Sequence, residues 1–155
     1  MRWPGKIPAG RRTSEIAANM DIFPSVAKIA GAELPADRIL DGRDLTPLIT
    51  GKTESGPHET FYFFGDSYTE DWQPNKIPNL LAIRKGRWKL HFQTTSGRGT
   101  GHGRELYDLG SDVGEEYNRI EDNPDIAKEL ESEAAIFLAE FNQHIRPYGV
   151  VAREK

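Results

Sequence analysis

The sequence contains no cysteine among its 155 residues. Disulfide bonds, thiolate nucleophiles and cysteine-based zinc sites are therefore excluded. No run approaches the about 20 apolar residues of a membrane-spanning helix. The start, MRWPGKIPAGRR, also lacks the apolar stretch of a secretory signal peptide. We expect no membrane contact from the chain as given, and its compartment stays open.

The sequence also has fewer basic than acidic residues. Twenty Lys and Arg residues face 24 Asp and Glu residues, which gives a net charge of -4 and a pI near 5.6. Because no basic arm or stripe offsets this balance, nucleic acid is excluded as the main partner. The hydrophobic (37%) and charged (28%) fractions are ordinary for a globular chain with room for one domain.

A β-hairpin is predicted over residues 80–92, LLAIRKGRWKLHF. Apolar and polar residues alternate on both sides of Lys85-Gly86, where a tight turn is expected. Side chains alternate across a strand, so Trp88, Leu90 and Phe92 form an apolar face. Arg87, Lys89 and His91 form a basic face on the opposite side.

The rest of the fold follows from that apolar face. Residues 60–64 and 105–109 are strand-like, so we predict an antiparallel meander with two insertions, at 65–78 and 94–103. Asn123 and Pro124 begin a helix whose apolar positions repeat at helical spacing until Pro147. We predict an α+β fold, in which this C-terminal helix covers a small antiparallel sheet of about four strands.

The N-terminal part predicts helices and loops without a sheet. Residues 2–10 form a loop in which Trp3 is typical of the exit from a preceding strand, which favours truncation. Residues 21–31 predict a short helix capped by Asp21 and ended by Gly31. Its Ile22, Val26 and Ile29 need a partner surface that the nearby sequence does not supply. A helical turn, capped by Asp44, is expected at 44–50.

Several stretches together resemble the C-terminal part of a sulfatase of the arylsulfatase or N-acetylgalactosamine-6-sulfatase type, in the alkaline-phosphatase-like superfamily. In chain order they are residues 2–7, 21–31, 41–48, 82–90, 105–109 and 112–118. Val113 stands where the family's Asp-Pro-Gly-Glu turn has proline. The resemblance assigns residues 1–57 to the tail of the large α/β domain and 58–155 to a C-terminal subdomain.

The resemblance implies a sulfuric ester hydrolase with a formylglycine nucleophile, made from a Cys/Ser-x-Pro-x-Arg motif, and a calcium ion. Both belong to the parent enzyme's preceding half. The nearest candidate here, residues 55–59, has Glu59 in place of the arginine and is interpreted as a loop. We therefore predict no catalytic residue, no metal ligand and no cofactor in this chain, and no activity for the chain alone.

Five residues are candidates for the rim of the parent enzyme's cleft, where an anionic sulfated substrate binds: Lys89, His91, Arg98, His102 and Arg104. Arg98 and His102 lie in a glycine-rich loop at 97–103 that does not match a dinucleotide-binding fingerprint. The alternatives are a mobile loop for 97–103, and a solvated face or a seam against the large domain for Lys89 and His91. His58 and His144 are interpreted as surface residues.

A metal site at Asp37, Asp41 and Asp44 is less favoured than turn and capping roles, because their spacing fits no EF-hand loop. Three functional hypotheses remain. The chain is part of an enzyme on sulfated sugars or aryl sulfates whose catalytic N-terminal half is its missing partner; or it is a stand-alone, non-catalytic interaction module; or another subunit supplies the missing half. Parents of this type are commonly exported, and the sequence leaves the compartment unknown.

Overall fold

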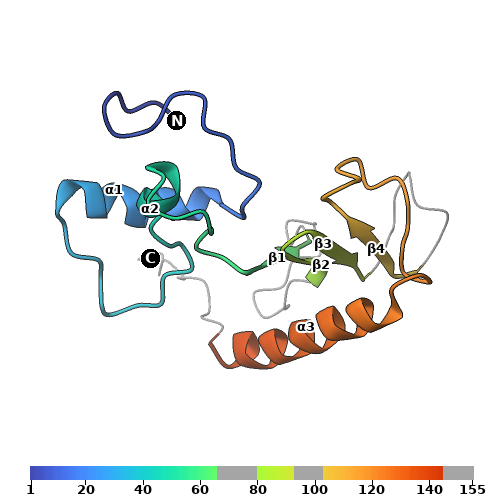
Figure 1. The fold of residues 1–155 in the computed structure, drawn as a ribbon. Helices are drawn as coiled ribbons and strands as arrows, with labels where there is room; N and C mark the ends of the chain where they lie inside the picture. Colours follow the sequence, from blue (N-terminus) through green and yellow to red (C-terminus); the bar gives the residue numbers. More distant parts are fainter. Residues whose placement is uncertain (66–79, 93–102, 145–155) are drawn as a thin grey trace, which may run out of the picture. The chain divides into compact units, whose positions relative to one another are not determined.

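The computed structural model describes residues 1–65, 80–92 and 103–144 (Figure 1). The chain divides into two compact units, Met1–Phe61 and Tyr62–Lys155, here called the first and second unit. The division falls inside the first strand. The boundary predicted from the sequence, after residue 57, lies a few residues earlier and stays a prediction.

The first unit contains a 3-10 turn, η1 (Asn19–Asp21), and two helices, α1 (Ile22–Ala30) and α2 (Thr46–Ile49). The predicted helix over 21–31 is confirmed, and Gly31 ends it in the left-handed conformation with φ 71°. Asp44, predicted as the cap of this turn, lies one residue before the N-cap Leu45, and its Oδ1 accepts a hydrogen bond from the Thr46 amide (2.7 Å). Little apolar surface is buried here, mainly Ile16, Leu45 and Leu48.

The capping role predicted for Asp21 is wrong. Its carboxylate makes no bond to the first turn of α1, and instead accepts hydrogen bonds from the amides of Ala18 and Arg43, each at 2.8 Å. The reason is that η1 already places Asp21 in helical backbone conformation, with its side chain directed back to Ala18. Asp21 therefore joins the segments on both sides of α1.

The second unit is built on one sheet with strand order β1-β2-β3-β4. The strands are β1 (Thr60–Phe64), β2 (Leu80–Lys85), β3 (Trp88–His91) and β4 (Glu105–Asp108). Leu90 pairs with Ile83 on one side and with Leu106 on the other, both antiparallel. Gly86 adopts φ 54° in the turn between β2 and β3, which favours glycine. The predicted hairpin and four-stranded antiparallel sheet are confirmed.

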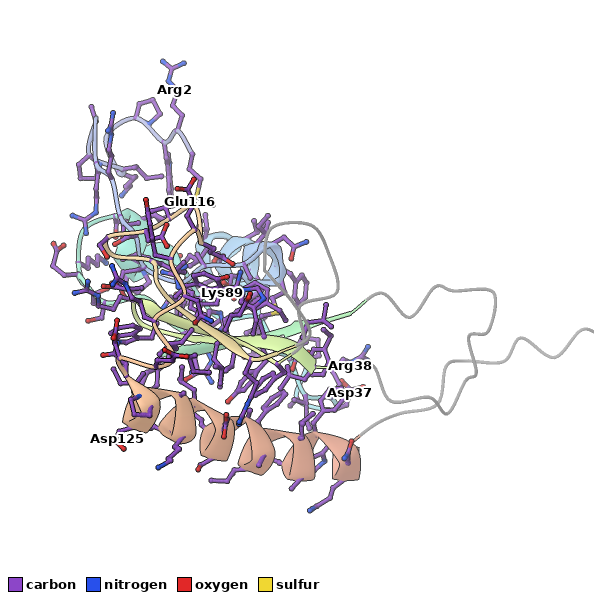
Figure 2. All side chains as sticks on the ribbon, turned by 90° about the vertical axis from the view of Figure 1, so that its right-hand side faces the viewer. Arg2, Asp37, Arg38, Lys89, Glu116 and Asp125 are labelled. Atoms are coloured by element: carbon purple, nitrogen blue, oxygen red, sulfur yellow. The ribbon has the colours of Figure 1, made fainter. Side chains whose placement is uncertain are left out.

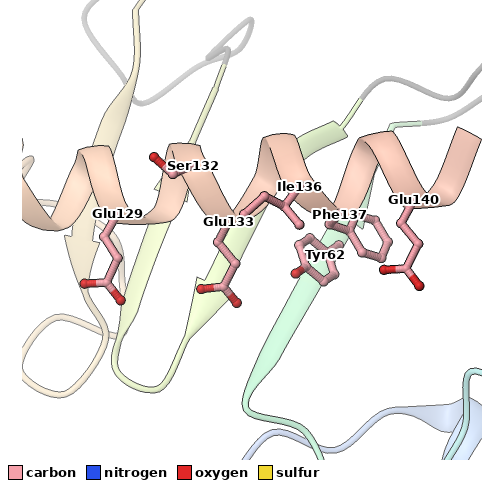
Figure 3. Close-up of a pocket in the computed structure, with 7 residues that line it drawn as sticks. All are labelled: Tyr62, Glu129, Ser132, Glu133, Ile136, Phe137 and Glu140. Carbon is pink, nitrogen blue, oxygen red and sulfur yellow. The ribbon is translucent and has the colours of Figure 1, made fainter.

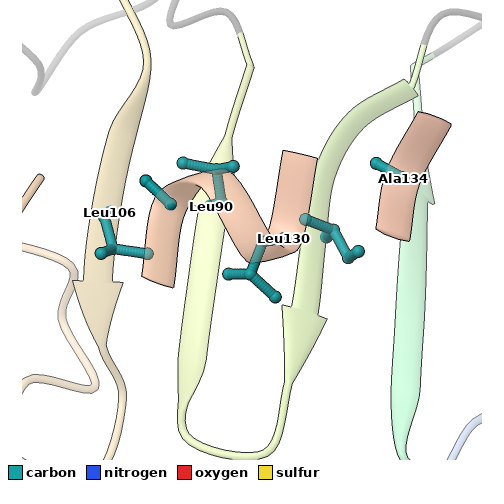
Figure 4. Close-up of a cluster of buried hydrophobic side chains, with 6 residues drawn as sticks. Leu90, Leu106, Leu130 and Ala134 are labelled. Atoms are coloured by element: carbon teal, nitrogen blue, oxygen red, sulfur yellow. The ribbon is translucent and has the colours of Figure 1, made fainter. Parts of the chain in front are cut away.

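Helix α3 (Pro124–His144) covers one face of this sheet (Figure 1). Beneath it lies a cluster of buried side chains, Ile83, Leu90, Leu106, Ala127, Leu130 and Ala134 (Figure 4). The alanines allow a close approach of the helix. Towards its C-terminus Phe137 stacks on Tyr62 with centroids 3.6 Å apart, and Phe141 stacks on Phe64 at 5.1 Å. The prediction that this helix covers the sheet is confirmed.

None of the helices in the described ranges is both long and apolar enough to cross a membrane.

Candidate functional site

The basic side of the hairpin binds a carboxylate of its own chain. Lys89 Nζ donates to Glu115 Oε1 (2.6 Å), and His91 Nε2 lies 2.7 Å from Glu115 Oε2. Strand alternation places both residues opposite the buried Leu90, and Figure 2 shows Lys89 on the face of the sheet away from α3. Glu115 follows β4 in a turn, where it adopts the left-handed conformation with φ 55°. We call Lys89, His91 and Glu115 the hairpin triad.

The Glu115 carboxylate is held in its charged form by its two partners. Partial burial on its own would raise the pKa of Glu115, but the hydrogen bonds and charges of Lys89 and His91 outweigh it and hold that pKa below its ordinary value of 4.5. The Lys89 ammonium also lies 4.9 Å from the centre of the Phe63 ring. An incoming sulfate would therefore have to displace the Glu115 carboxylate from Lys89 and His91.

Next to the triad, the same face of β4 is buried. Tyr107 and Glu105 are both more than nine-tenths covered, and the Tyr107 hydroxyl donates to Glu105 Oε2 at 2.8 Å. The His91 ring meets the Tyr107 ring edge-on, with centroids 5.6 Å apart. Burial, with the Glu105 hydrogen bond and charge, raises the pKa of Tyr107 above its ordinary value. This face is therefore a packed polar layer at β4 rather than a fully solvated surface.

The five predicted rim residues do not form one constellation. Lys89 and His91 share Glu115, whereas the Arg104 guanidinium binds Glu131 of α3, on the opposite side of the sheet. Arg98 and His102 lie outside the described residues. Their contact with a substrate stays a prediction.

The first unit contains a buried contact between a histidine and a carboxylate that the sequence did not reveal. His58 Nε2 lies 2.7 Å from Asp21 Oδ1, and the His58 side chain is only 7% exposed. The interpretation of His58 as a surface residue is therefore wrong. No pattern signals the pair, because its partners are far apart in the sequence. Burial would raise the pKa of Asp21, but the amides of Ala18 and Arg43 and the His58 ring lower it below its ordinary value of 3.8.

A serine lies beside this pair without forming a nucleophilic dyad. Ser25 Oγ donates to the Asp21 carbonyl oxygen (2.6 Å) and accepts from the Leu45 amide (2.8 Å). Both bonds go to backbone groups, and Ser25 is buried. The group of Asp21, Ser25 and His58, with the amides of Ala18, Arg43 and Leu45, is called the Asp21 network. Its role is to join α1 to the segments around it.

The Ser-x-Pro-x segment at 55–59 is held at two points. The Gly56 amide donates to Glu15 Oε2 at 2.7 Å, and His58 binds Asp21 as described. Glu59 stands at the position where formylglycine maturation requires arginine. The segment has the contacts of a structural loop.

Carboxylates in the described residues are not arranged as a calcium site. Asp37 pairs with the neighbouring Arg38, and Asp44 accepts a hydrogen bond from the Thr46 amide. Within residues 1–65, 80–92 and 103–144, no group of three or more His, Asp or Glu side chains has the arrangement of metal ligands. The donor set described here does not fit a calcium ion, and no reaction step is derived through one.

One groove of about 360 Å³ lies between β1 and α3 (Figure 3). Its lining includes the stacked rings of Tyr62 and Phe137 and the side chains of Glu129, Glu133 and Glu140. Lys85 Nζ binds Glu129 and Glu133 at 3.0 and 2.9 Å. Because its charged lining is acidic, the groove disfavours a sulfate ester.

With the geometry described, comparison with known proteins identifies the family. The family model described as N-sulphoglucosamine sulphohydrolase, C-terminal, matches residues 1–140. The chain belongs to this sulfatase family. The resemblance predicted from the motifs is confirmed.

Individual sulfatases align with parts of the chain. Human steryl-sulfatase is 44% identical over 96 residues, which cover 61% of this chain and 15% of that protein. Human arylsulfatase A is 37% identical over 137 residues, covering 76% of this chain and 25% of that protein. The chain therefore spans a quarter or less of the length of these two relatives.

A solved structure shares the sulfatase-domain fold of this chain. It is described as a complex with its substrate, D-glucosamine-2-N,6-O-disulfate. The alignment has a TM-score of 0.66 at 22% identity, and covers 92% of this chain and 28% of that one. At this identity the likeness concerns the fold alone. It agrees with the α+β fragment of an α/β sulfatase predicted from the sequence.

Proposed function

We propose that this chain is the C-terminal part of a sulfuric ester hydrolase acting on sulfated sugars or aryl sulfates, and that its own residues supply neither the nucleophile nor the metal ligands. The observation that carries the proposal is the family match over residues 1–140, to a model that describes only the C-terminal portion of such enzymes. The relatives contain much more polypeptide than this chain spans.

The residues of the chain support the proposal that the nucleophile and the metal ligands lie elsewhere in the enzyme. It has no cysteine, and its Ser-x-Pro-x segment lacks the arginine of the maturation motif. The carboxylates of Asp21 and Glu115 are already bound by amides or by Lys89 of the same chain. The formylglycine and the calcium ion are accordingly proposed to belong to the part of the enzyme outside this sequence.

Substrate contact by this chain is a separate part of the proposal. Lys89 and His91 are oriented alike and both bind the Glu115 carboxylate, and Arg104 is paired with Glu131. Arg98 and His102 stay candidates from the sequence. A structural role for the triad, attaching the turn after β4 to the hairpin, requires no ligand.

The second candidate function is a stand-alone, non-catalytic interaction module. The observation that favours it is confined to the second unit, which has its own hydrophobic core and an internally paired polar face. A module of this kind would remain folded without the rest of an enzyme.

The test is an assay of the purified chain on a chromogenic aryl sulfate with calcium present. No turnover is expected. Mixing the chain with the part of human arylsulfatase A outside the matched region is expected to yield measurable hydrolysis that neither component has. Hydrolysis by the chain alone would contradict the first proposal, and a folded chain that never supports activity would favour the module.

A further inference from the structure

The groove between β1 and α3 follows the length of the helix. Six of its seven lining residues belong to α3 and repeat at helical spacing: Glu129, Ser132, Glu133, Ile136, Phe137 and Glu140. At about 1.5 Å of rise per residue, Glu140 lies about 10 Å along the axis from Glu133 and about 16 Å from Glu129. Figure 3 shows the three carboxylates on one side of the helix, with the Tyr62 ring between Glu133 and Glu140. The groove therefore has carboxylates at intervals and aromatic rings between them.

The surface between these carboxylates is apolar. The Tyr62 and Phe137 rings are stacked with centroids 3.6 Å apart, and both line the groove. Ile136 lines it as well and is 70% exposed, although it is a large apolar side chain. A methylene chain packed along these three side chains would remove apolar surface of both partners from water. A ligand that fits this groove is therefore apolar between its charged groups.

One end of the groove already binds an alkylammonium group. Lys85 Nζ donates to Glu129 Oε1 and to Glu133 Oε2, at 3.0 and 2.9 Å. The hydrogen bonds to Glu133 and Glu129 raise the pKa of Lys85 above its ordinary value, so the two carboxylates hold its charged form. The Glu129 side chain is still 64% exposed, and a carboxylate accepts from more than one donor. This end is therefore accessible to a second ammonium group.

The other end of the groove carries the carboxylate of Glu140. This residue is exposed, and it has no hydrogen-bond or ion-pair partner within residues 1–65, 80–92 and 103–144. Burial and then the charge of Glu133 raise the pKa of Tyr62, and the charge of Glu140 adds to that increase. Among the described side chains of the groove, three carboxylates face the one ammonium group of Lys85. The groove therefore attracts further positive charge.

The spacing of the carboxylates distinguishes between classes of cation. A metal ion such as calcium needs several oxygen ligands that converge on one point. The three glutamates are instead spread along α3, and the described residues contain no group of three or more side chains arranged as metal ligands. A linear polyamine carries ammonium groups separated by methylene chains. Its charged and apolar parts alternate in the same order as those of the groove.

We propose that the groove between β1 and α3 binds a linear aliphatic polyamine. One terminal ammonium lies at Glu140, and another ammonium lies at the end formed by Glu129 and Glu133. The methylene chain between them packs along Ile136 and the stacked rings of Tyr62 and Phe137. This site is separate from the hydrolysis of sulfate esters, and it requires no residue outside the second unit.

The test compares two cations of equal charge and different shape. Spermidine, a linear trication, and hexaamminecobalt(III), a compact one, are titrated separately into the purified chain at low ionic strength. The NMR resonances of the Tyr62 ring and the Glu140 amide are followed. Spermidine is expected to shift both saturably, with a dissociation constant of about 1 mM, and hexaamminecobalt(III) to bind at least threefold more weakly. Equal or tighter binding of the compact ion, or shifts only outside the groove, would overturn the proposal.

Three exposed residues provide matched variants for the same titration. Glu140→Gln and Glu121→Gln remove the same charge, but Glu121 precedes α3 and does not line the groove. Glu140→Gln is expected to weaken spermidine binding about threefold and Glu121→Gln to leave it unchanged, because only the first removes a direct ion pair. Ile136→Ala is expected to weaken the binding of spermidine and not that of hexaamminecobalt(III). Equal effects of the two glutamine variants would show general attraction to an acidic chain and would refute the site.

Discussion

The two units of this chain are stabilised in opposite ways. In the second unit, α3 places Leu130 and Ala134 onto Leu90 and Leu106, and the charged residues lie outside that core. In the first unit, the Asp21 carboxylate just before α1 and the Ser25 hydroxyl of α1 lie inward, and apolar residues of α1 lie outside. The second unit therefore has a mainly apolar interior, whereas the interior of the first is held to a large extent by hydrogen bonds.

This difference between the units bears on the two functional hypotheses, a part of a larger enzyme and a stand-alone interaction module. Burial of apolar surface contributes about 25 cal/mol per Å² and requires no partner once the helix covers the sheet. A hydrogen-bonded network contributes only about 1 kcal/mol per bond in net terms, and it fixes orientation more than it stabilises. Each of the following changes tests that contrast.

The largest effect is expected from Leu130→Ala in the second unit. Leu130 is fully buried against the sheet, so the substitution removes its contacts and leaves a cavity. A loss of about 2–5 kcal/mol in the free energy of unfolding is expected from denaturant titration, with a smaller loss for the half-buried Phe141→Ala. Ile136→Ala, on the exposed side of the same helix, is the control, expected within about 0.5 kcal/mol of wild type. Equal stability of all four proteins would contradict the assigned core.

Asp21→Ala tests the first unit. It removes the acceptor for the amides of Ala18 and Arg43 and the partner of His58, all in a buried site. A loss of about 3 kcal/mol is expected, because buried donors are left without acceptors.

Hydrogen exchange resolved along the chain separates the two units. With Asp21→Ala, amides of residues 18–45 are expected to exchange faster, while those of β2, β3 and α3 keep wild-type protection. The exposed Asp37→Ala is the matched control. Faster exchange confined to the second unit would refute the contrast.

Acidification should weaken the Asp21 network. The pKa of Asp21 is lower in the folded chain than its ordinary 3.8, so protons bind more tightly to the unfolded chain. Its stabilisation is complete well above that pH, and is lost as the pH falls through 3.8 towards the folded value. The protection factors of amides 18–45, taken relative to the intrinsic exchange rate at each pH, are therefore expected to fall between about pH 5 and pH 3, and Asp21→Asn is expected to flatten that dependence. An unaltered profile in Asp21→Asn would show that other groups are responsible.

The smallest effect concerns sulfate at the hairpin triad. Glu115 already binds Lys89 and His91. Sulfate at about 10 mM is therefore expected to leave the NMR resonances of the His91 ring where they are in chloride of equal ionic strength. Glu115→Gln removes the carboxylate that binds Lys89 and His91 and is expected to show a small, saturable shift. A saturable shift in the wild-type chain would instead favour the substrate-rim prediction for Lys89 and His91.

Much of the second unit could be predicted from its sequence, because local patterns there agree with the tertiary structure. Alternation over 80–92, the turn at Lys85-Gly86 and the helical spacing after Pro124 each correspond to an observed element. Leu90 and Leu130 were expected in the core because periodicity reports which face of an element is apolar. The motifs also indicated the family without any structure.

The polar contacts could not be predicted, because they join residues distant in sequence whose approach depends on the assembled fold. His58 meets Asp21, and Glu115 meets His91, only after their segments are placed side by side. The structure also explains one motif residue: a Cβ at Gly42 would overlap the carbonyl oxygen of Met20, so only glycine fits. The sequence by itself determined the elements, the core of the second unit and the family. Only the tertiary structure decided that α1 turns its apolar side outward, because hydrogen bonds from segments distant in sequence hold Asp21 and Ser25 inward.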